Sequence, residues 1–387
     1  MKILQLVKTS VGATWAWEQM CELRKAGARV SVILPGEGPM LERYRDSGIE
    51  VSFADFDPVS LIRKGPAHRQ SIFGLVESLG PDVIHSHFVQ TTLTARLVLG
   101  RHHRIPRFFQ IAGPLHLENY LTRQADVRSA GQADYWVPAC ELSRTLLLKG
   151  GAASDRMRLI YHGLRRDRFA ARPTGRLRAI LGVGANVPII GMVAYMYAPK
   201  AFLGQTRGLK GHEDLIDAVA MLPVPFSNAV LVMVGGPWGD GARAYAERVI
   251  SYGKSRLGNR VHFLGTRSDV LDLYPDISVA VHPSHSENLG GAVESMMMGV
   301  PTIATRVGGF PDIVIPGQTG WLADARSPAS LAREIATVLA DVDLAKQTAS
   351  SARTFVADLL DITSQTRRLT RFYEDVVSQR IVRSLAA

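Results

Sequence analysis

The chain has 387 residues, 46% hydrophobic and 21% charged, with 45 basic and 35 acidic side chains that give a formal net charge of +10. This length suits two domains that each bury a core, and no apolar run reaches the roughly 18 residues that a membrane span needs. Only Cys21 and Cys140 are present, without metal-ligand spacing, which argues against a disulfide framework or a structural zinc site. The cytoplasm is therefore the expected location.

The first half of the chain alternates short Val-, Ile- and Leu-rich runs with segments of helical period, as a parallel sheet with crossover helices requires. Residues 2–7 are predicted as a strand because no small-residue cleavage site of a signal peptide follows them. A helix is expected over residues 14–25, stopped by Gly27. Further strands are predicted at residues 30–34, 82–85, 108–111, 135–138 and 158–161. Residues 1–170 are therefore expected to form one doubly wound lobe.

The second half repeats this alternation after residues 171–187, whose Pro173 and several glycines indicate a hinge. Strands are predicted at residues 189–195, 229–234, 261–264, 279–282 and 301–304. The intervening helices are expected to open near His212, Gly241, Gly291 and Ser327. Residues 188–364 form the expected second lobe. The helical C-terminal stretch, from about 365 to 387, is expected to pack back on the first lobe.

Most of the excess positive charge lies in the first lobe. Its basic clusters are Arg63, Lys64, His68 and Arg69; Arg101, His102, His103, Arg104 and Arg107; and Arg165, Arg166 and Arg168. Such patches favour an anionic partner, which could be a membrane surface, a phosphorylated acceptor or nucleic acid. Scattered solvated arginines explain the same counts equally well.

The segment from Ser284 to Val314 has the clearest chemical content. The predicted strand before this segment ends at His282. A polar loop with Glu287 and Asn288 follows, and then two glycines, Gly290 and Gly291, open a helix that carries Glu294. Ligands of open α/β sheets bind beyond the carboxyl ends of the strands. Glycines and helix N-terminal amides there can hold a diphosphate, while carboxylates can accept hydrogen bonds from ribose and sugar hydroxyls.

This segment resembles the signature of glycosyltransferase family four, the glycosyl transferases group 1, which have the two-lobed GT-B fold and retain anomeric configuration. The matching residues are Glu294, Gly299, Pro301, Ala304, Thr305, Val307, Gly308 and Gly309. The family's two glutamates are separated by seven residues, whereas Glu287 and Glu294 are separated by six. Either the loop is one residue shorter, or Ser286 takes the first position.

The resemblance implies α/β architecture with two Rossmann-like lobes facing a central cleft. It makes Glu294 the ribose ligand and Glu287 or Ser286 the sugar-hydroxyl ligand. The other donor-binding candidates of this loop are Asn288, Leu289, Gly290 and Gly291.

A second motif, residues 195–219, follows a predicted strand and leads into a helix. Lys210 with the glycine after it resembles the family's Lys-Gly pair, whose cation neutralises the leaving diphosphate. The arginine that the family places directly after the strand is replaced by Tyr195, and Arg207 or Lys200 could supply the missing charge.

The first lobe offers weaker candidates. By the same resemblance, Gly12 belongs to the loop near the donor phosphates, and His116 lies near the donor sugar with Glu118 as an alternative cleft residue. His87 could line the acceptor cleft, although core packing explains it equally well. The predicted catalytic residues are thus Lys210, Glu287 and His116.

The sequence therefore predicts a retaining, metal-independent glycosyltransferase whose donor is a UDP- or GDP-linked sugar and which needs no cofactor. Its expected acceptor is a glycan or lipid-linked molecule of polysaccharide or glycolipid assembly, with attachment to the inner face of an anionic membrane and no nucleic acid. The alternatives are a soluble small-molecule acceptor, a nucleotide-sugar epimerase with the same fold, and a non-catalytic nucleotide-sugar binding module.

Overall fold

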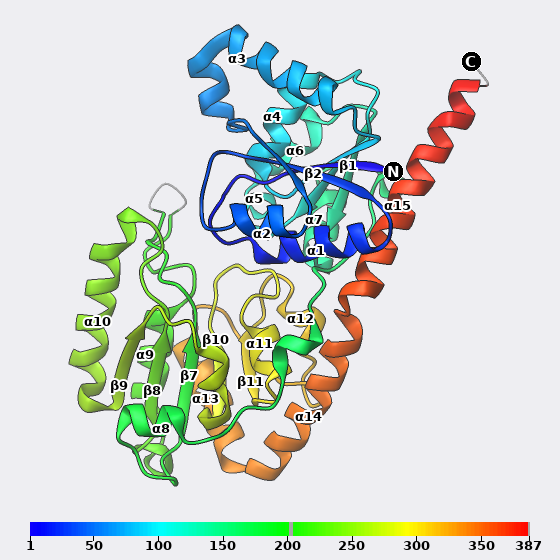
Figure 1. Cartoon of the computed structure of the whole chain (residues 1–387). Helices are drawn as coiled ribbons and strands as arrows, with labels where there is room; N and C mark the ends of the chain where they lie inside the picture. Colours follow the sequence, from blue (N-terminus) through cyan, green and yellow to red (C-terminus); the bar gives the residue numbers. More distant parts are fainter. Residues whose placement is uncertain (201–203, 386–387) are drawn as a thin grey trace. The chain divides into compact units, whose positions relative to one another are not determined.

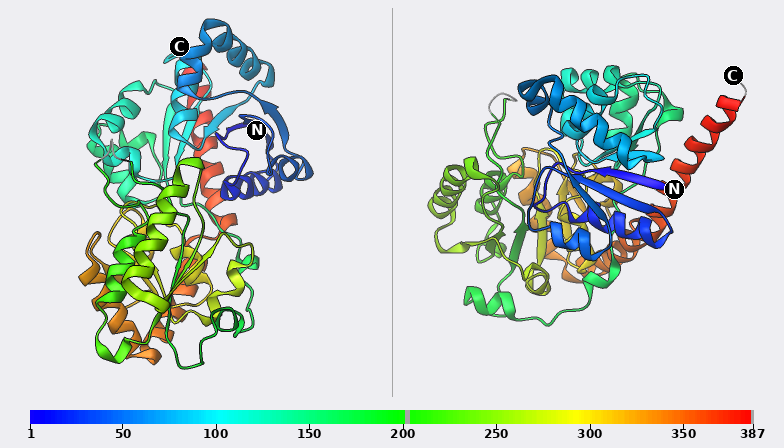
Figure 2. Two further views of the ribbon diagram at one scale, coloured as in Figure 1. Left: turned by 90° about the vertical axis from the view of Figure 1, so that its left-hand side faces the viewer. Right: turned by 45° about the horizontal axis from the view of Figure 1, so that its top comes forward.

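The computed structural model describes residues 1–200 and 204–385, so residues 201–203 of the second motif and the last two residues of the C-terminal stretch lie outside the described residues. The chain divides into two compact units, Met1–Leu164 with Leu360–Ala387, and Arg165–Leu359. Figures 1 and 2 show each unit as a sheet with helices on both faces. No helix among the described residues is both long and apolar enough to cross a membrane.

The first unit is built on a parallel sheet of six strands in the order β3-β2-β1-β4-β5-β6. The strands are β1 (Lys2–Leu6), β2 (Arg29–Leu34), β3 (Glu50–Phe53), β4 (Val83–Ser86), β5 (Arg107–Ile111) and β6 (Asp134–Pro138). The helices are α1 (Thr14–Lys25), α2 (Leu41–Asp46), α3 (Pro58–Leu79), α4 (Val89–Leu99), α5 (Leu115–Glu118), α6 (Tyr120–Ser129), α7 (Glu141–Lys149) and α15 (Ile362–Leu385). Strand β1 pairs with both β2 and β4, so the strand order reverses between β1 and β4.

Alternate residues of β1 supply two separate cores, as the two-residue period of a strand requires. Ile3 packs with α1 and with Phe372 and Tyr373 of α15, whereas Leu4 packs with α3 and α4 on the other face. The C-terminal helix α15 is therefore part of the first unit's core.

One strand of this unit was predicted wrongly and another was missed. Residues 158–161 do not form a strand; only the amides of Arg158 and Ile160 bond to β6, at 3.2 and 3.0 Å, beside an isolated bridge at Met157. Strand β3 was not predicted; it is a four-residue edge strand in which no residue is fully buried. In α3, Gly65 has φ 73° ahead of Pro66, which kinks the helix.

The second unit has a parallel sheet in the order β12-β11-β10-β7-β8-β9, the same connectivity as the first. The strands are β7 (Ile189–Val193), β8 (Val230–Val234), β9 (Val261–Gly265), β10 (Val279–His282), β11 (Thr302–Thr305) and β12 (Trp321–Ala323). The helices are α8 (Arg176–Leu181), α9 (His212–Ala220), α10 (Arg243–Leu257), α11 (Ala292–Met297), α12 (Phe310–Ile313), α13 (Pro328–Ala340) and α14 (Val342–Leu359). The predicted α/β class with two Rossmann-like lobes is thereby confirmed.

The stretch expected to be a hinge is attached to the second unit. Leu177 of α8 is fully buried, and the Asp276 carboxylate accepts hydrogen bonds at 2.7 Å from the backbone amides of Gly175 and Leu177. The C-terminal helix begins after a break between α14 and α15, where the Asp361 carboxylate caps α15 by accepting from the Ser364 amide at 2.8 Å. The chain therefore changes unit at 164/165 and again at 359/360.

Candidate functional site

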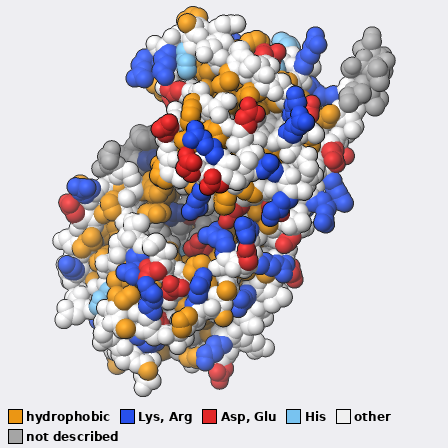
Figure 3. Space-filling view, viewed as in Figure 1, with side chains coloured by type: hydrophobic (Ala, Val, Ile, Leu, Met, Phe, Trp, Pro, Cys, Tyr) orange, Lys and Arg blue, Asp and Glu red, His pale blue; other side chains and the backbone are white. Residues whose placement is uncertain are grey.

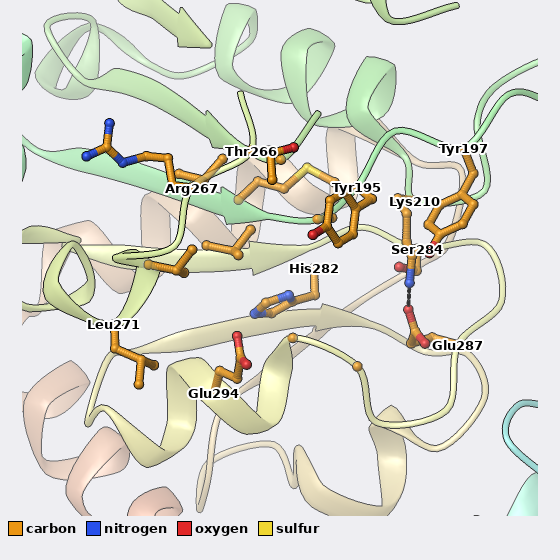
Figure 4. Close-up of a pocket in the computed structure, with 18 of the residues that line it drawn as sticks. Tyr195, Tyr197, Lys210, Thr266, Arg267, Leu271, His282, Ser284, Glu287 and Glu294 are labelled. Atoms are coloured by element: carbon orange, nitrogen blue, oxygen red, sulfur yellow. Dashed lines mark hydrogen bonds and ion pairs between the residues drawn. The ribbon is translucent and has the colours of Figure 1, made fainter. Parts of the chain in front are cut away.

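A pocket of about 430 Å³ opens at the carboxyl ends of β7, β8, β9 and β10 in the second unit (Figure 4). Strands β7 and β10 are neighbours, and β8 and β11 lie on their outer sides, so the strand order reverses between them. Ligands of doubly wound sheets bind at this reversal, where the loops from adjacent strands diverge. The pocket therefore lies where the connectivity of the sheet favours a ligand.

The loop between β10 and α11 is held tightly against the turn after β11. The amide of Gly309 donates to the backbone carbonyls of Glu287 and Asn288, at 3.2 and 3.0 Å. Gly308 has φ 57°, and a β-carbon there would lie 1.5 Å from the carbonyl oxygen of Glu287. The Val-Gly-Gly turn thus fixes the Glu287 loop through contacts that a larger residue would prevent.

A close ion pair joins Lys210 to Glu287 across the pocket, and Figure 4 shows the two side chains pointing toward each other. Their side chains are only 18% and 15% exposed. The loops that carry them also touch, because the His285 amide donates to the Leu209 carbonyl at 2.8 Å. Gly211, at φ 73°, leaves no room for a β-carbon against Pro283, so the Lys-Gly pair has a steric basis.

Further along the pocket, burial controls the charge of two ionisable groups. Burial raises the pKa of the Glu294 carboxyl, and the charge of Arg168 offsets part of this shift. Burial, aided by the charge of Lys210, lowers the pKa of His282 to about 3. His282 is therefore neutral at physiological pH, and its Nε2 lies 3.0 Å from the Ser295 hydroxyl.

The pocket thus combines three cations, two carboxylates and two glycines whose backbone is open to it: Lys210, Arg168, Arg267, Glu287, Glu294, Gly290 and Gly291. Cations and exposed amides stabilise phosphate oxygens, while carboxylates accept hydrogen bonds from hydroxyl groups. This set of groups can hold a polyhydroxylated molecule that carries phosphates.

Comparison with known families decides the class. The family model of the glycosyl transferases group 1 matches residues 200–355 of the chain, and the model of Glycosyltransferase Family 4 matches residues 12–168. This chain belongs to the group 1 glycosyl transferases, with the GT-B fold.

Two relatives are D-inositol 3-phosphate glycosyltransferases. The protein of Corynebacterium glutamicum is 31% identical over 222 residues, covering 54% of this chain and 49% of that protein. The protein of Streptomyces bingchenggensis is 29% identical over 295 residues, covering 70% of this chain and 62% of that protein. The chain thus spans about half to three fifths of the length of these two relatives.

The fold likeness extends over the whole chain. The crystal structure of Anabaena HepE in complex with UDP and glucose superposes with a TM-score of 0.81 at 22% sequence identity, covering 97% of this chain and 100% of that one. At 22% identity, this likeness shows that the two chains share a fold.

The structure brings half of the ten predicted donor-binding residues together in this pocket. Lys210, Glu287, Gly290, Gly291 and Glu294 all line the pocket, and Glu287 rather than Ser286 faces it. Three other loop candidates, Ser286, Asn288 and Leu289, are buried, at 4 to 6% exposure, and are not among the described residues that line the pocket.

Neither expected substitute for the missing arginine lies in the pocket. Arg207 donates to the carboxylates of Asp214 and Asp217, at 2.6 and 2.8 Å, so its guanidinium is engaged by α9. Lys200 is exposed and is not among the described lining residues. Arg168 and Arg267 are the arginines that line the pocket.

The first-unit candidates are placed as follows. Gly12, at φ 77°, precedes α1, and Glu118 is exposed at the end of α5. The His116 Nε2 lies 3.3 Å from the Asp126 carboxylate, so the ring is held by a buried acid. His87 is fully buried, with Nε2 2.6 Å from the Gln5 side chain, because its position after β4 directs it into the core.

Several pocket residues were not predicted. Thr266 and Arg267 follow β9 and could have been found by applying the strand-end rule to that strand as well. Arg168 belongs to a basic cluster of the sequence, but its place in this pocket follows from a tertiary contact. Tyr197 also lines the pocket, with its ring 5.7 Å from the Lys210 ammonium.

Proposed function

We propose that the chain transfers a sugar, with retention and without a metal, from a nucleoside-diphosphate sugar bound in the second-unit pocket to an acceptor hydroxyl. One observation carries this proposal. The Lys210–Glu287 pair, the glycine loop and Glu294 lie in a single pocket at the strand-order reversal.

The proposed donor pose follows from the chemistry of these groups. Glu294 accepts hydrogen bonds from the ribose hydroxyls, and the diphosphate lies against the amides of Gly290 and Gly291. Lys210 then turns from Glu287 toward the diphosphate, which leaves the Glu287 carboxylate free to accept from a hydroxyl of the donor sugar. This pose is supported by the side chains that line the pocket and by the contact between Lys210 and Glu287.

Breaking the bond between the donor sugar and its diphosphate separates charge, and the pocket can stabilise the negative part. As the bond between the anomeric carbon and the diphosphate oxygen breaks, negative charge grows beside the Lys210 ammonium. A preorganised cation there stabilises the departing group by several kcal/mol. The acceptor oxygen bonds to the same face of the sugar and its proton passes to the departing diphosphate oxygen, so we assign no enzymatic nucleophile. Within the first unit, His116, held by Asp126, stays a proposed catalytic residue.

The acceptor is proposed to be a glycan or lipid-linked molecule at an anionic membrane. The basic cluster Arg63, Lys64 and Arg69 lies on α3, whose neighbouring Val59 and Ile62 are 71% and 79% exposed. Figure 3 shows Lys and Arg side chains gathered over this helix. Exposed apolar residues beside cations favour an anionic lipid surface. Sedimentation with phosphatidylglycerol vesicles, lost in high salt, tests this surface.

A soluble phosphorylated acceptor is the second candidate. It is favoured by the relatives, which are D-inositol 3-phosphate glycosyltransferases. Transfer assays with a panel of UDP- and GDP-sugars, with soluble polyol phosphates or lipid-linked acceptors, distinguish the two. Donor consumption without any acceptor would instead identify an epimerase or a hydrolase, and absence of binding to UDP and GDP would refute the donor site.

A further inference from the structure

The first unit has a groove of about 540 Å³ that the proposed transfer reaction does not use. Its walls come from α7, from the segment around residues 154–160 and from α15. The charged lining consists of four arginines and one carboxylate: Arg144, Arg158, Arg368, Arg371 and Glu141. The groove belongs wholly to the first unit, whereas the donor pocket belongs wholly to the second.

Three of these arginines are held in place at one end of the guanidinium. Arg158 bonds to the Asp375 carboxylate at 2.7 Å, and Arg144 bonds to Glu141 at 2.8 Å. Arg368 donates to the carbonyl of Leu159 at 3.1 Å. Each guanidinium has five N–H donors, so these contacts orient the groups and leave donors for a ligand.

The charge of the groove is not balanced by its own residues. Four guanidinium groups face one lining carboxylate, and the Asp375 carboxylate that pairs with Arg158 is half exposed to solvent. Arginines are normally kept apart by their mutual repulsion, which an anion between them relieves. Phosphate matches such a cluster because it carries up to two negative charges and accepts bidentate guanidinium bonds.

The size and remaining lining narrow the ligand class. A groove of this volume holds a small molecule rather than a bare ion. Its uncharged walls include Leu148, Met157 and Ile160, which can cover the carbon skeleton of a ligand while the arginines hold its phosphate.

We propose that this groove binds a molecule with a phosphate group through Arg144, Arg158, Arg368 and Arg371. The same chemistry is offered by a soluble phosphorylated sugar or polyol and by a lipid headgroup. The inference does not rest on the proposed transfer reaction, since none of these residues lines the donor pocket.

The test compares two variants of the full chain that lose equal charge. Arg368→Gln with Arg371→Gln removes two groove cations, and Arg45→Gln with Arg128→Gln removes two exposed arginines elsewhere in the first unit. Calorimetric titration with inorganic phosphate at low salt should give a dissociation constant at least about tenfold weaker for the groove pair, since hydrogen bonds to charged groups are the strong ones. The control pair should stay within about twofold of the unmodified chain.

A second variant keeps the test valid if the groove pair folds poorly. Arg144→Gln changes a side chain whose partner Glu141 is itself 47% exposed, so the core is untouched, and it should also weaken phosphate binding. An unchanged melting temperature then shows that the loss is local. Equal weakening in the control pair, or no change in either groove variant, would overturn the proposal.

Two further arms identify the source of the phosphate. Glycerol 3-phosphate that binds more tightly than inorganic phosphate, with no vesicle sedimentation dependent on Arg368 and Arg371, indicates a soluble ligand. Sedimentation with phosphatidylglycerol vesicles that falls in the groove pair but not in the control pair indicates a headgroup. Either result supports the site, and a glycerol 3-phosphate affinity and a vesicle sedimentation that are both unchanged in the groove pair overturn it.

Discussion

Replacing Lys210 with alanine tests the donor site directly, because the side chain combines a structural contact and a proposed chemical role. Its ion pair with Glu287 is neither at the surface nor fully buried, since the two side chains are 18% and 15% exposed. Exposed pairs contribute about 0.2–1 kcal/mol, and breaking a buried pair costs about 3–5 kcal/mol. We therefore expect Lys210→Ala to reduce the free energy of unfolding by about 1–3 kcal/mol.

The expected loss of turnover is larger than this loss of stability. Removing one preorganised group that stabilises developing negative charge lowers kcat by about 10²–10³. Steady-state kinetics below the melting temperature of the variant measures kcat/KM, and Lys254→Ala, an exposed lysine of the same unit, is the matched control. A Lys210→Ala enzyme with kcat/KM within twofold of the unmodified chain would refute the assignment.

Replacing Glu287, the partner of Lys210, is expected to affect UDP binding and sugar transfer differently. Glu287→Gln leaves Lys210 without a carboxylate to hold it, so UDP should bind as tightly as before or more tightly. Transfer should nevertheless fall, because the donor sugar loses a charged acceptor of hydrogen bonds. Calorimetry with UDP and turnover with the UDP-sugar separate the two effects, and weaker UDP binding would contradict the proposed movement of Lys210.

Three other predictions concern residues of the second unit, and a fourth concerns the need for a metal. Arg207→Ala should lower the melting temperature without changing UDP affinity, since its partners are Asp214 and Asp217. Glu294→Gln should weaken donor binding about tenfold yet raise the melting temperature at pH 7, because burial raises the pKa of Glu294 and its ionised form opposes folding there. Gly308→Ala should cost more than about 1 kcal/mol of stability and most of the activity, because φ is 57° and the Glu287 carbonyl occupies the space. Chelation of divalent metals with EDTA should leave transfer unchanged.

Each of these has a result that counts against it. Weaker UDP binding in Arg207→Ala would return that arginine to the donor site. The stability gain of Glu294→Gln should disappear below the ordinary carboxyl pKa, where the glutamate is neutral in both states, and a gain that persists there would have another cause. A fully active Gly308→Ala enzyme would contradict the fixed loop, and activity lost to EDTA but restored by magnesium would contradict the metal-free reaction.

The fold could be predicted because several signals agree along most of the chain. The buried strand β8 is a continuous apolar run, β10 is apolar up to His282, and the predicted helix 14–25 has the bounds of α1. The missed strands, β3 and β12, are edge strands of only four and three residues that are partly exposed, so each is too short to give a clear strand signal. Local sequence therefore identified the inner strands better than the edges.

The site was predicted where backbone geometry restricts the residue type. Glycines at positions such as 211 and 308 are required by positive φ and close contacts, so their pattern is readable in the sequence. Backbone geometry does not determine which carboxylate a long cationic side chain pairs with. Arg207 could have faced the pocket or α9, and only the positions of Asp214 and Asp217 in the folded unit decide between them.

The division of the chain has a consequence for its synthesis. The first 164 residues emerge from the ribosome before any of the second unit, yet their core is incomplete until Phe372 and Tyr373 of α15 arrive. The unit that begins first is thus finished after the other, and its apolar face stays uncovered until the whole second unit has been made. A nascent chain of this kind is a natural client for a chaperone that shields exposed apolar surface.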